Sequence, residues 1–552
     1  MATAWDGVKE AYLPPEELRI SPKLRLHDRA DREVDPITFE VMRHRLWNSV
    51  VEHGWRVIRG SGSPICQFAH DMNPVLLTER GDLVYYGPFL QYLAAGLDST
   101  AKWIIENRSD EPGIEDGDAF LCNDPWIGAN HSEDVSILVP VFIEGELFCW
   151  IGNELHQYDL GGTTPGSFCP DAPDAFHEAT IFPAVRIMRQ GKIQVDIEGA
   201  YLRASRMPDL VALDLRAQLA GIHVARQRVL EIVQRYGPET VKAVMRKIID
   251  DSEEALVRRL RAIPNGEWRD EVFFEVASPG DRRTFRLVLI LRKRGDRLVF
   301  SNEGTDPQVG SLNQTFLHWK GSILGAISNH LLWDQLFAVG GAQRHIDFEP
   351  VSGTITCASW PAATSCSSPL AGVATVGMAS TCLSKMLMTD PDQRHEVNAK
   401  FGSNPHPMVL VSGVNQYGQP FGSLLLDAMA APVGAFSFRD GVGTGGYPFD
   451  PRVPCANVED SERVMPVLYL YRYEMPDSGG AGKFRGGNSA VVGIVAHGTD
   501  EVIHSTAGGG CAVPTATGLS GGYPANCSSY KIKRNTDVRA RLASGNIPTS
   551  LD

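Results

Sequence analysis

The chain has 552 residues, of which 43% are apolar and 21% charged, as in a folded globular protein too long for one hydrophobic core. The net charge of −14 disfavours a nucleic-acid scaffold, because such proteins present a basic face. The ten cysteines include no C-x-x-C pair, which argues against a thiolate zinc site and predicts buried thiols in a cytoplasmic protein. We expect neither a secretory signal nor a transmembrane helix, because the N-terminus lacks an apolar segment and no apolar run approaches membrane-spanning length.

The first part of the chain predicts an extended arm followed by helices. Residues 1–33 are polar and charged, and an arm of this kind could lie on a partner. Asp35 and Pro36 form a typical helix start, and apolar residues at helical spacing continue to about Arg59. The next expected elements are strands around 66–75 and 81–86 and a helix over 90–107.

Residues 117–167 hold the pattern with the clearest chemical meaning. His131 and Asp134 precede an apolar run that turns near residue 145 and returns to His156. Because an antiparallel hairpin brings its start and its end together, His156 can lie beside His131 and Asp134. Two imidazoles and a carboxylate suit Mn²⁺, Fe²⁺ or Zn²⁺ and leave positions open for a substrate. The alternative is a pair of ordinary surface histidines near a turn.

Four polar residues beside this hairpin are the candidates for catalytic groups. Asp159 opens a glycine-rich loop, where it could accept a hydrogen bond from a metal-ligating imidazole or could cap the loop. Asp124 lies in an Asn-Asp-Pro sequence that is typical of a turn. Gln157 and Tyr158 directly follow the last histidine of the pattern.

Strand runs and helix runs are mixed without strict βαβ alternation, which predicts an α+β fold with mixed or antiparallel sheets and packed helices. A Pro-Asn-Gly sequence at 264–266 indicates a boundary between domains. The predicted parts are an arm (1–33), an N-terminal domain with the metal site (34–265) and a C-terminal α+β domain with glycine-rich loops (266–552). The other expected elements are helices over 203–237 and 238–263, strands over 271–277, 283–291 and 297–300, helices over 314–337 and 371–388, and irregular β structure from 402.

Familiar nucleotide-binding and hydrolase motifs fail in this chain. Residues 441–446 match G-x-G-x-x-G, but a Tyr-Pro pair follows where a helix is required. Residues 479–484 resemble a phosphate loop but lack its first glycine and the Ser or Thr after the lysine. No serine nucleophile elbow of the hydrolase type is signalled either. ATP chemistry would therefore require another subunit.

The ordered set of motifs resembles the B-type subunit of the hydantoinase/oxoprolinase family. That family includes the large subunits of ATP-dependent ketone carboxylases for acetone and acetophenone. The matching segments are Asp35-Pro36, Asn123-Asp124-Pro125, His131-x-x-Asp134, His156-x-x-Asp159-x-Gly161-Gly162, Gly304-Thr305-Asp306-Pro307, Gly482-Lys483-Phe484-Arg485-Gly486-Gly487 and Gly518-Leu519-Ser520-Gly521-Gly522-x-Pro524.

This resemblance implies a hetero-oligomer in which a sibling A-type subunit with an actin-like fold uses the ATP. In the carboxylases, a small zinc-binding subunit would accompany the pair. In the acetone carboxylase relatives, a manganese ion is bound by a His-x-x-Asp pair and a later histidine. These positions map onto His131, Asp134 and His156, with iron or zinc as alternatives to manganese.

The resemblance leaves three functions open. Hydantoinase-like members usually carry His-His-Ala-Asp where this chain has His156, Gln157, Tyr158 and Asp159, which favours the carboxylase branch. The implied reaction is carboxylation of a ketone's enol or enolate with bicarbonate-derived CO₂ at the metal site. The alternatives are an ATP-dependent cyclic-amide hydrolase of the hydantoinase, 5-oxoprolinase or lactamase type, and a non-catalytic scaffold.

Overall fold

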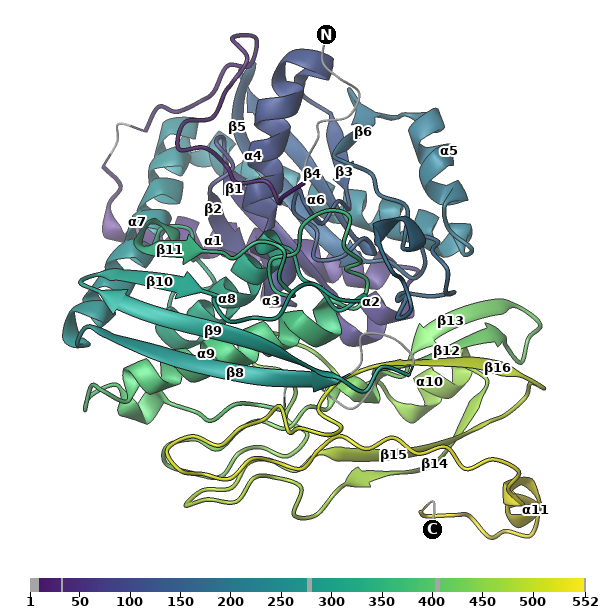
Figure 1. Ribbon diagram of the computed structural model, residues 1–552. Coiled ribbons are helices and arrows are strands. Elements are labelled where there is room, and N and C mark those ends of the chain that lie inside the picture. The colour runs from purple at the N-terminus through teal and green to yellow at the C-terminus, as the bar shows by residue number, and fades with distance from the viewer. Residues whose placement is uncertain (1–8, 31–32, 276–279, 403–407, 551–552) are drawn as a thin grey trace.

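The computed structural model describes residues 9–30, 33–275, 280–402 and 408–550 (Figure 1). The predicted α+β class is confirmed, with helices packed on several sheets. The largest sheet has seven antiparallel strands in the order β2-β1-β5-β4-β3-β6-β7. Its strands are β1 (Met72–Thr78), β2 (Leu83–Tyr86), β3 (Ala119–Cys122), β4 (Asp134–Ile143), β5 (Glu146–His156), β6 (Val185–Arg189) and β7 (Lys192–Ile193).

The predicted hairpin is the centre of this sheet. Strands β4 and β5 are joined by Glu144 and Gly145, which both have positive φ (51° and 76°), as a tight hairpin turn requires. The register pairs the first residue of β4, Asp134, with the last residue of β5, His156. Strand β1 pairs with the other side of β5 and also starts at this end of the sheet. The start of β1, the start of β4 and the end of β5 therefore lie side by side at one end of the sheet.

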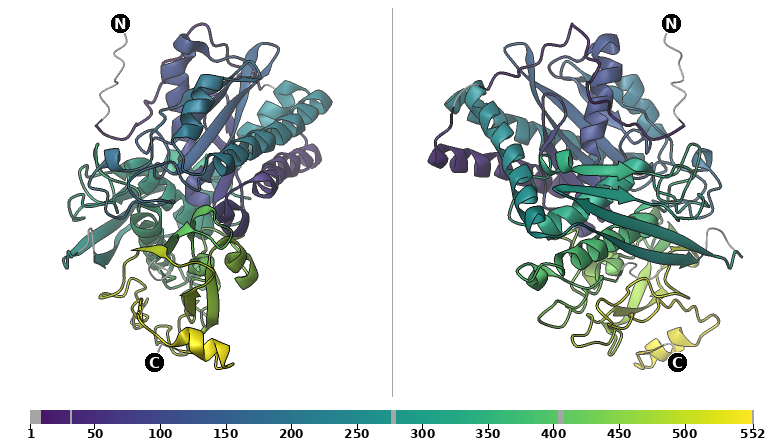
Figure 2. Two further views of the ribbon diagram at one scale, coloured as in Figure 1. Left: turned by 90° about the vertical axis from the view of Figure 1, so that its right-hand side faces the viewer. Right: turned by 60° about the vertical axis from the view of Figure 1, so that its left-hand side comes forward.

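Three long helices cover one face of the seven-stranded sheet, where Figure 2 shows them beside one another. They are α1 (Pro36–Gly60), α6 (Pro208–Tyr236) and α7 (Pro238–Ala262). The start of α1 is confirmed, since the Asp35 carboxylate accepts hydrogen bonds from Ile37 N (3.1 Å) and Thr38 N (3.0 Å). The predicted start of α6 at 203 was wrong. A separate helix α5 (Val195–Arg203) precedes it, and Pro208 begins α6 after the non-helical Met207.

The opposite face packs on shorter helices and a second sheet. These elements are α3 (Gln91–Ala94), α4 (Leu97–Arg108), α8 (Phe316–Leu331), α9 (Val373–Leu387), β8 (Gly266–Glu275), β9 (Thr284–Arg294), β10 (Arg297–Ser301) and β11 (Ile346–Glu349). Alternate residues of each strand face the two cores: Leu76 and Ile137 lie under the long helices, whereas Leu77 and Leu138 lie on this side.

Three predicted elements differ in detail from the structure. Residues 64–69 form helix α2 (Pro64–Ala69) and not the start of a strand, with Pro64 at the first turn and His70 in the left-handed region at its end. The helix expected over 90–107 is interrupted at 95–96 between α3 and α4. Helix α8 ends at Leu331 and not at 337, because Leu332 has non-helical backbone angles (φ −133°, ψ 23°). Residues 276–277 of the strand predicted over 271–277 lie outside the described residues.

Helix α9 and the turn before it, Ser368–Leu387, are long and apolar enough by composition to cross a membrane. Within the fold, 94% of the apolar window is buried. This helix packs against α8 and the second sheet, as a core helix does.

The remainder of the chain forms the smaller sheets at the lower end of Figure 1. One has the order β13-β12-β16 and the other pairs β14 with β15. These elements are β12 (Met408–Val414), β13 (Pro420–Leu424), β14 (Val467–Glu474), β15 (Ala490–Ala496), β16 (Val502–Ala507), α10 (Val458–Val464) and α11 (Val538–Ala543).

The N-terminal segment 9–30 lies against the chain itself, although the sequence suggested an arm that could lie on a partner. His27 N donates to Leu147 O (2.9 Å), and Leu147 N donates to Arg25 O (2.8 Å). The division at residue 265 stays a prediction. The same hydrophobic core contains Trp150 and Leu289, from the two sides of that boundary.

The cysteine prediction needs a correction. Seven of the ten thiols are buried, as expected, but Cys511 and Cys527 are exposed and Cys455 is partly exposed. The two exposed cysteines lie in the long C-terminal segment after β16, where few side chains are covered.

Candidate metal centre

The structure brings together the three residues predicted to bind a metal. His131 lies in the loop before β4, Asp134 is the first residue of β4, and His156 is the last residue of β5. The Asp134 Oδ1 atom lies 2.9 Å from His156 Nδ1 and 3.3 Å from His131 Nε2. One potential ligand atom from each residue lies within 4.8 Å of the other two, and all three side chains are buried. The alternative of surface histidines is therefore wrong.

Hydrogen bonds between the Asn123 side chain and backbone groups hold the loop that carries His131. The side chain of Asn123 donates to Ser132 O (2.6 Å) and to Thr180 O (2.9 Å), and it accepts from Phe182 N (2.6 Å). Asp134 N donates to His131 O (3.0 Å), which closes the turn between the two ligands. The sequence around the Asn-Asp-Pro turn thus fixes the position of one imidazole relative to the sheet.

Unpartnered buried atoms are concentrated at this triad. Nδ1 of His131, Nε2 of His156 and Oδ2 of Asp134 are buried without a hydrogen-bond partner among the described residues, and His131 Nε2 has only its contact with Asp134. Buried polar atoms without partners are costly, and imidazole nitrogens and carboxylate oxygens are ligands for divalent transition metals. The donor set therefore fits a divalent cation.

The electrostatics of the triad favour positive charge. Burial lowers the pKa of His131, which keeps its imidazole neutral and able to act as a ligand. Burial pushes the pKa of Asp134 upward, but the imidazoles of His131 and His156 outweigh it and hold that pKa below its ordinary value. At His156, burial is outweighed by Asp134 and Asp71, and the pKa is raised. The site thus holds a carboxylate between two imidazoles and stabilises a cation next to it.

The four residues predicted as catalytic do not converge on the triad in one cluster. Asp124 caps its own turn by accepting from Trp126 N (2.9 Å). Tyr158 directs its hydroxyl to Gly422 N (3.1 Å) and so connects the hairpin to β13. The amide of Gln157 is buried without a side-chain partner among the described residues, while its backbone N donates to Glu133 O (2.8 Å).

Asp159 caps its loop, which was one of its two predicted roles. Its carboxylate accepts from Gly161 N (3.1 Å), Gly166 N (2.9 Å) and Arg206 N (2.9 Å), and pairs with Arg206 Nη1 (2.8 Å). None of the hydrogen bonds described for Asp159 goes to an imidazole of the triad. The carboxylate therefore organises the glycine-rich loop and fastens it to the start of α6.

An Asp159→Asn variant is expected to lower the free energy of unfolding by about 1–3 kcal/mol, because a buried, multiply bonded carboxylate loses its charge. Chemical unfolding measures this loss, and elemental analysis measures bound metal in the same samples. We expect the metal content to be unchanged, since the triad does not contact Asp159. Loss of metal with unaltered stability would instead indicate that Asp159 accepts a hydrogen bond from a metal-ligating imidazole.

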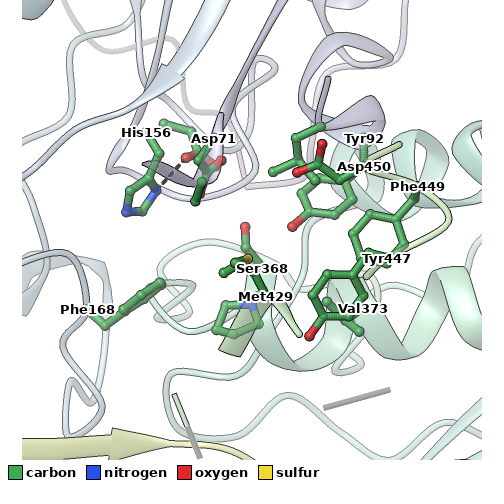
Figure 3. Close-up of a pocket in the computed structure, with 14 residues that line it drawn as sticks. Asp71, Tyr92, His156, Phe168, Ser368, Val373, Met429, Tyr447, Phe449 and Asp450 are labelled. Atoms are coloured by element: carbon green, nitrogen blue, oxygen red, sulfur yellow. Dashed lines mark hydrogen bonds and ion pairs between the residues drawn. The ribbon is translucent and has the colours of Figure 1, made fainter. Parts of the chain in front are cut away.

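A cavity with an empty volume of about 570 Å³ adjoins the triad (Figure 3). Asp134 and His156 form part of its wall. The other residues around it are Ala69, Asp71, Leu90, Tyr92, Phe168, Ser368, Pro369, Val373, Met429, Tyr447, Phe449 and Asp450.

The sequence pattern did not predict several of the residues that line this cavity. Asp71 directly precedes β1, and its backbone oxygen accepts from His156 N (3.1 Å). The pairing of β1 with β5 would have revealed it, because their start and end share one sheet edge. Asp450, Tyr447 and Phe449 come from a loop of the second half that carries no local signal for this position.

Aromatic rings enclose the triad on the cavity side. The ring of Phe168 lies 5.5 Å from that of His131 and 5.6 Å from that of His156, measured between centroids. His318 from α8 is also buried near the triad, with neither ring nitrogen partnered among the described residues. Burial lowers the pKa of His318 to about 3. Asp134 raises this pKa and His131 lowers it, both by less than burial does. A cation held by the triad would therefore be shielded from bulk water on this side.

Comparisons with known proteins relate almost the whole chain to one family. The hydantoinase B/oxoprolinase family profile matches residues 35–549. The delta subunit of acetophenone carboxylase from Aromatoleum aromaticum is 28% identical over 94% of this chain and 75% of that protein. The beta subunit of caprolactamase from Pseudomonas jessenii is 27% identical over 82% of this chain and 77% of that protein. The nucleotide-free structure of acetone carboxylase shares the fold, with a TM-score of 0.86, 24% identity, and coverage of 93% of this chain and 69% of the other.

Proposed function

Because the chain belongs to the hydantoinase B/oxoprolinase family, we propose that it is the catalytic subunit of an ATP-dependent ketone carboxylase. The observation that carries this proposal is the buried triad of His131, Asp134 and His156, which has unpartnered polar atoms and adjoins a cavity. The reaction is the carboxylation of a ketone's enol or enolate with CO₂ derived from bicarbonate.

The residues of the site have separate tasks in this proposal. His131, Asp134 and His156 would hold a divalent ion; the ligand types suit manganese, iron and zinc, and the resemblance to the acetone carboxylases favours manganese. Such an ion would supply a Lewis acid for the oxyanion that develops on the substrate. Phe168 covers the two imidazoles, and the adjoining cavity seats the carbon skeleton.

The ATP is used by a partner in this proposal. The sequence contains no complete phosphate-loop or dinucleotide motif, so an A-type ATPase subunit is the expected partner. The similar proteins are themselves named as subunits, and this supports a hetero-oligomer. A small zinc-binding subunit would complete the carboxylase, and we place the assembly in the cytoplasm.

A cyclic-amide hydrolase is the second candidate, because the caprolactamase subunit is nearly as similar as the acetophenone carboxylase subunit. The residues after His156 favour the carboxylase, since Gln157 and Tyr158 replace the His-Ala usual in hydantoinase-like members. In this fold, the Tyr158 hydroxyl reaches Gly422 N, a contact that alanine cannot make.

Reconstitution with the A-type ATPase subunit separates the two candidates. We expect ATP hydrolysis to require both a ketone and bicarbonate, and labelled bicarbonate to enter a carboxylated product. A lactam should give no stimulation. ATP hydrolysis that responds to a lactam or hydantoin and ignores bicarbonate would establish the hydrolase instead.

A further inference from the structure

We propose that the cavity beside the triad selects a neutral molecule with an apolar body about as large as one six-membered ring, and rejects substrates that carry a separate anionic group. This inference names the substrate class of the proposed site. It rests on the proposed function only in taking the triad as the reacting end of the cavity.

The walls away from the triad are mostly apolar and aromatic. In Figure 3, Tyr92, Tyr447 and Phe449 stand together on the side of the cavity opposite His156. Their rings contact one another, with centroids of Tyr447 and Phe449 4.9 Å apart and of Tyr92 and Phe449 5.3 Å apart. A wall of adjoining aromatic rings favours a flat or cyclic apolar group through contact area and aromatic packing.

The floor of the cavity limits the size of the occupant. Ser368 and Pro369 from the turn before α9, Val373 from the first turn of α9, and Met429 close it between the triad and the aromatic wall. Val373 is 4% exposed and the adjacent helix is packed in the core, so this floor cannot retreat easily. The space therefore suits a single ring with a short substituent.

Apart from His156 of the triad, the cavity is lined by carboxyl groups and by no basic side chain among the described residues. Asp71, Asp134 and Asp450 line it, and no lysine or arginine is among the lining residues that the structure describes. Arg452 lies close in sequence to Asp450, but its guanidinium is stacked over Trp55, 5.7 Å from the ring centroid. A ligand anion away from the triad would be buried among carboxyl groups without a cationic partner, which is strongly unfavourable.

Asp450 offers a neutral ligand a polar contact. It is buried, and its Oδ1 has no hydrogen-bond partner among the described residues. Burial raises the pKa of Asp450, with a further contribution from Asp71, so the protonated form is favoured. A protonated carboxyl can donate to a carbonyl oxygen, and neutral ketones and lactams both supply one.

The test is direct binding to the metal-loaded full chain, purified with its partner subunits, in the absence of ATP. Isothermal titration calorimetry compares three probes: acetophenone, ε-caprolactam and 5-oxoproline. We expect both neutral ring compounds to bind and 5-oxoproline, which carries a carboxylate, to bind at least about tenfold more weakly. Equal or tighter binding of 5-oxoproline, or failure of both neutral probes, would overturn the proposal.

A matched pair of variants locates the binding in this cavity. Val373→Trp fills the floor and should weaken both neutral probes at least about tenfold, whereas Val351→Trp, at a position 43% exposed, should leave them unchanged. Thermal unfolding and metal content are measured on both variants. If Val373→Trp does not fold, the comparison of the three probes on the wild-type chain still decides the proposal.

This experiment also separates the proposal from the function on which it rests. Binding of both neutral probes with turnover of the lactam alone would contradict the carboxylase and support the substrate class. Carboxylation of a ketone together with tight binding of 5-oxoproline would do the reverse.

Discussion

Replacing His131 or His156 with alanine is expected to remove the bound divalent ion and to lower turnover of the reconstituted complex by at least about 100-fold. Partners that merely orient metal ligands already contribute about 10- to 100-fold to metal affinity or activity, and a ligand contributes more. The two imidazoles lie 2.9 Å and 3.3 Å from the Asp134 carboxylate, so each variant leaves one imidazole and one carboxylate. Elemental analysis and steady-state turnover measure the two effects.

His177 provides a matched control for these variants. It is also paired with an aspartate three residues away, with 2.8 Å between His177 Nδ1 and Asp174 Oδ1, but its side chain is 46% exposed and lies outside the triad. A His177→Ala variant should keep both metal and turnover. Full activity of metal-free His131→Ala and His156→Ala proteins would contradict the metal proposal and favour the scaffold role.

A Glu79→Gln variant is expected to lower the free energy of unfolding by about 3 kcal/mol, because it leaves a buried ammonium without its counter-charge. Glu79 follows β1 and lies 2.6 Å from Nζ of Lys242 on α7, and both side chains are buried. The ammonium also donates to Phe148 O and lies 4.3 Å from the centroid of the Phe148 ring. The pair therefore connects the long helices to the sheet that carries the triad. Urea unfolding measures the change.

The exposed pair of Lys23 and Asp110 is the control for this prediction. Its N–O distance of 2.7 Å is almost the same, but both side chains are 74% exposed, so Asp110→Asn should leave stability unchanged. A Glu79→Gln/Lys242→Met double variant should recover most of the lost stability, because it removes both buried charges. Equal effects of Glu79→Gln and Asp110→Asn would show that burial does not determine the strength of these pairs.

The candidate metal ligands could be predicted from the sequence because a single hairpin, which is a local element, brings them together. His131 and His156 are 25 residues apart, yet the apolar run, the turn and the return strand fix which ends meet. The rest of the cavity could not be predicted in this way. Asp71 enters through the pairing of β1 with β5, and Asp450 enters through a loop of the other half of the chain. Such long-range placements leave no periodic signal.

The ends of the helices show the same limit of sequence-based prediction on a smaller scale. The start of α1 was predictable because Asp35 and Pro36 act within one turn of the helix. Helix α8 ends where Leu332 leaves the helical region (φ −133°, ψ 23°), although apolar residues continue as far as Phe337. Here the tertiary environment overrides the local preference of the sequence.

The cavity joins parts of the chain that can change independently. Asp134 and His156 come from the hairpin, whereas Val373, Met429, Tyr447, Phe449 and Asp450 come from segments more than 200 residues further on. A fragment that ended at residue 265 would contain all three proposed metal ligands and none of that distant wall. Substitutions in the later segments can consequently alter which molecules are accepted while the ligands stay the same. This arrangement gives evolution a route by which one inherited centre can acquire new substrates.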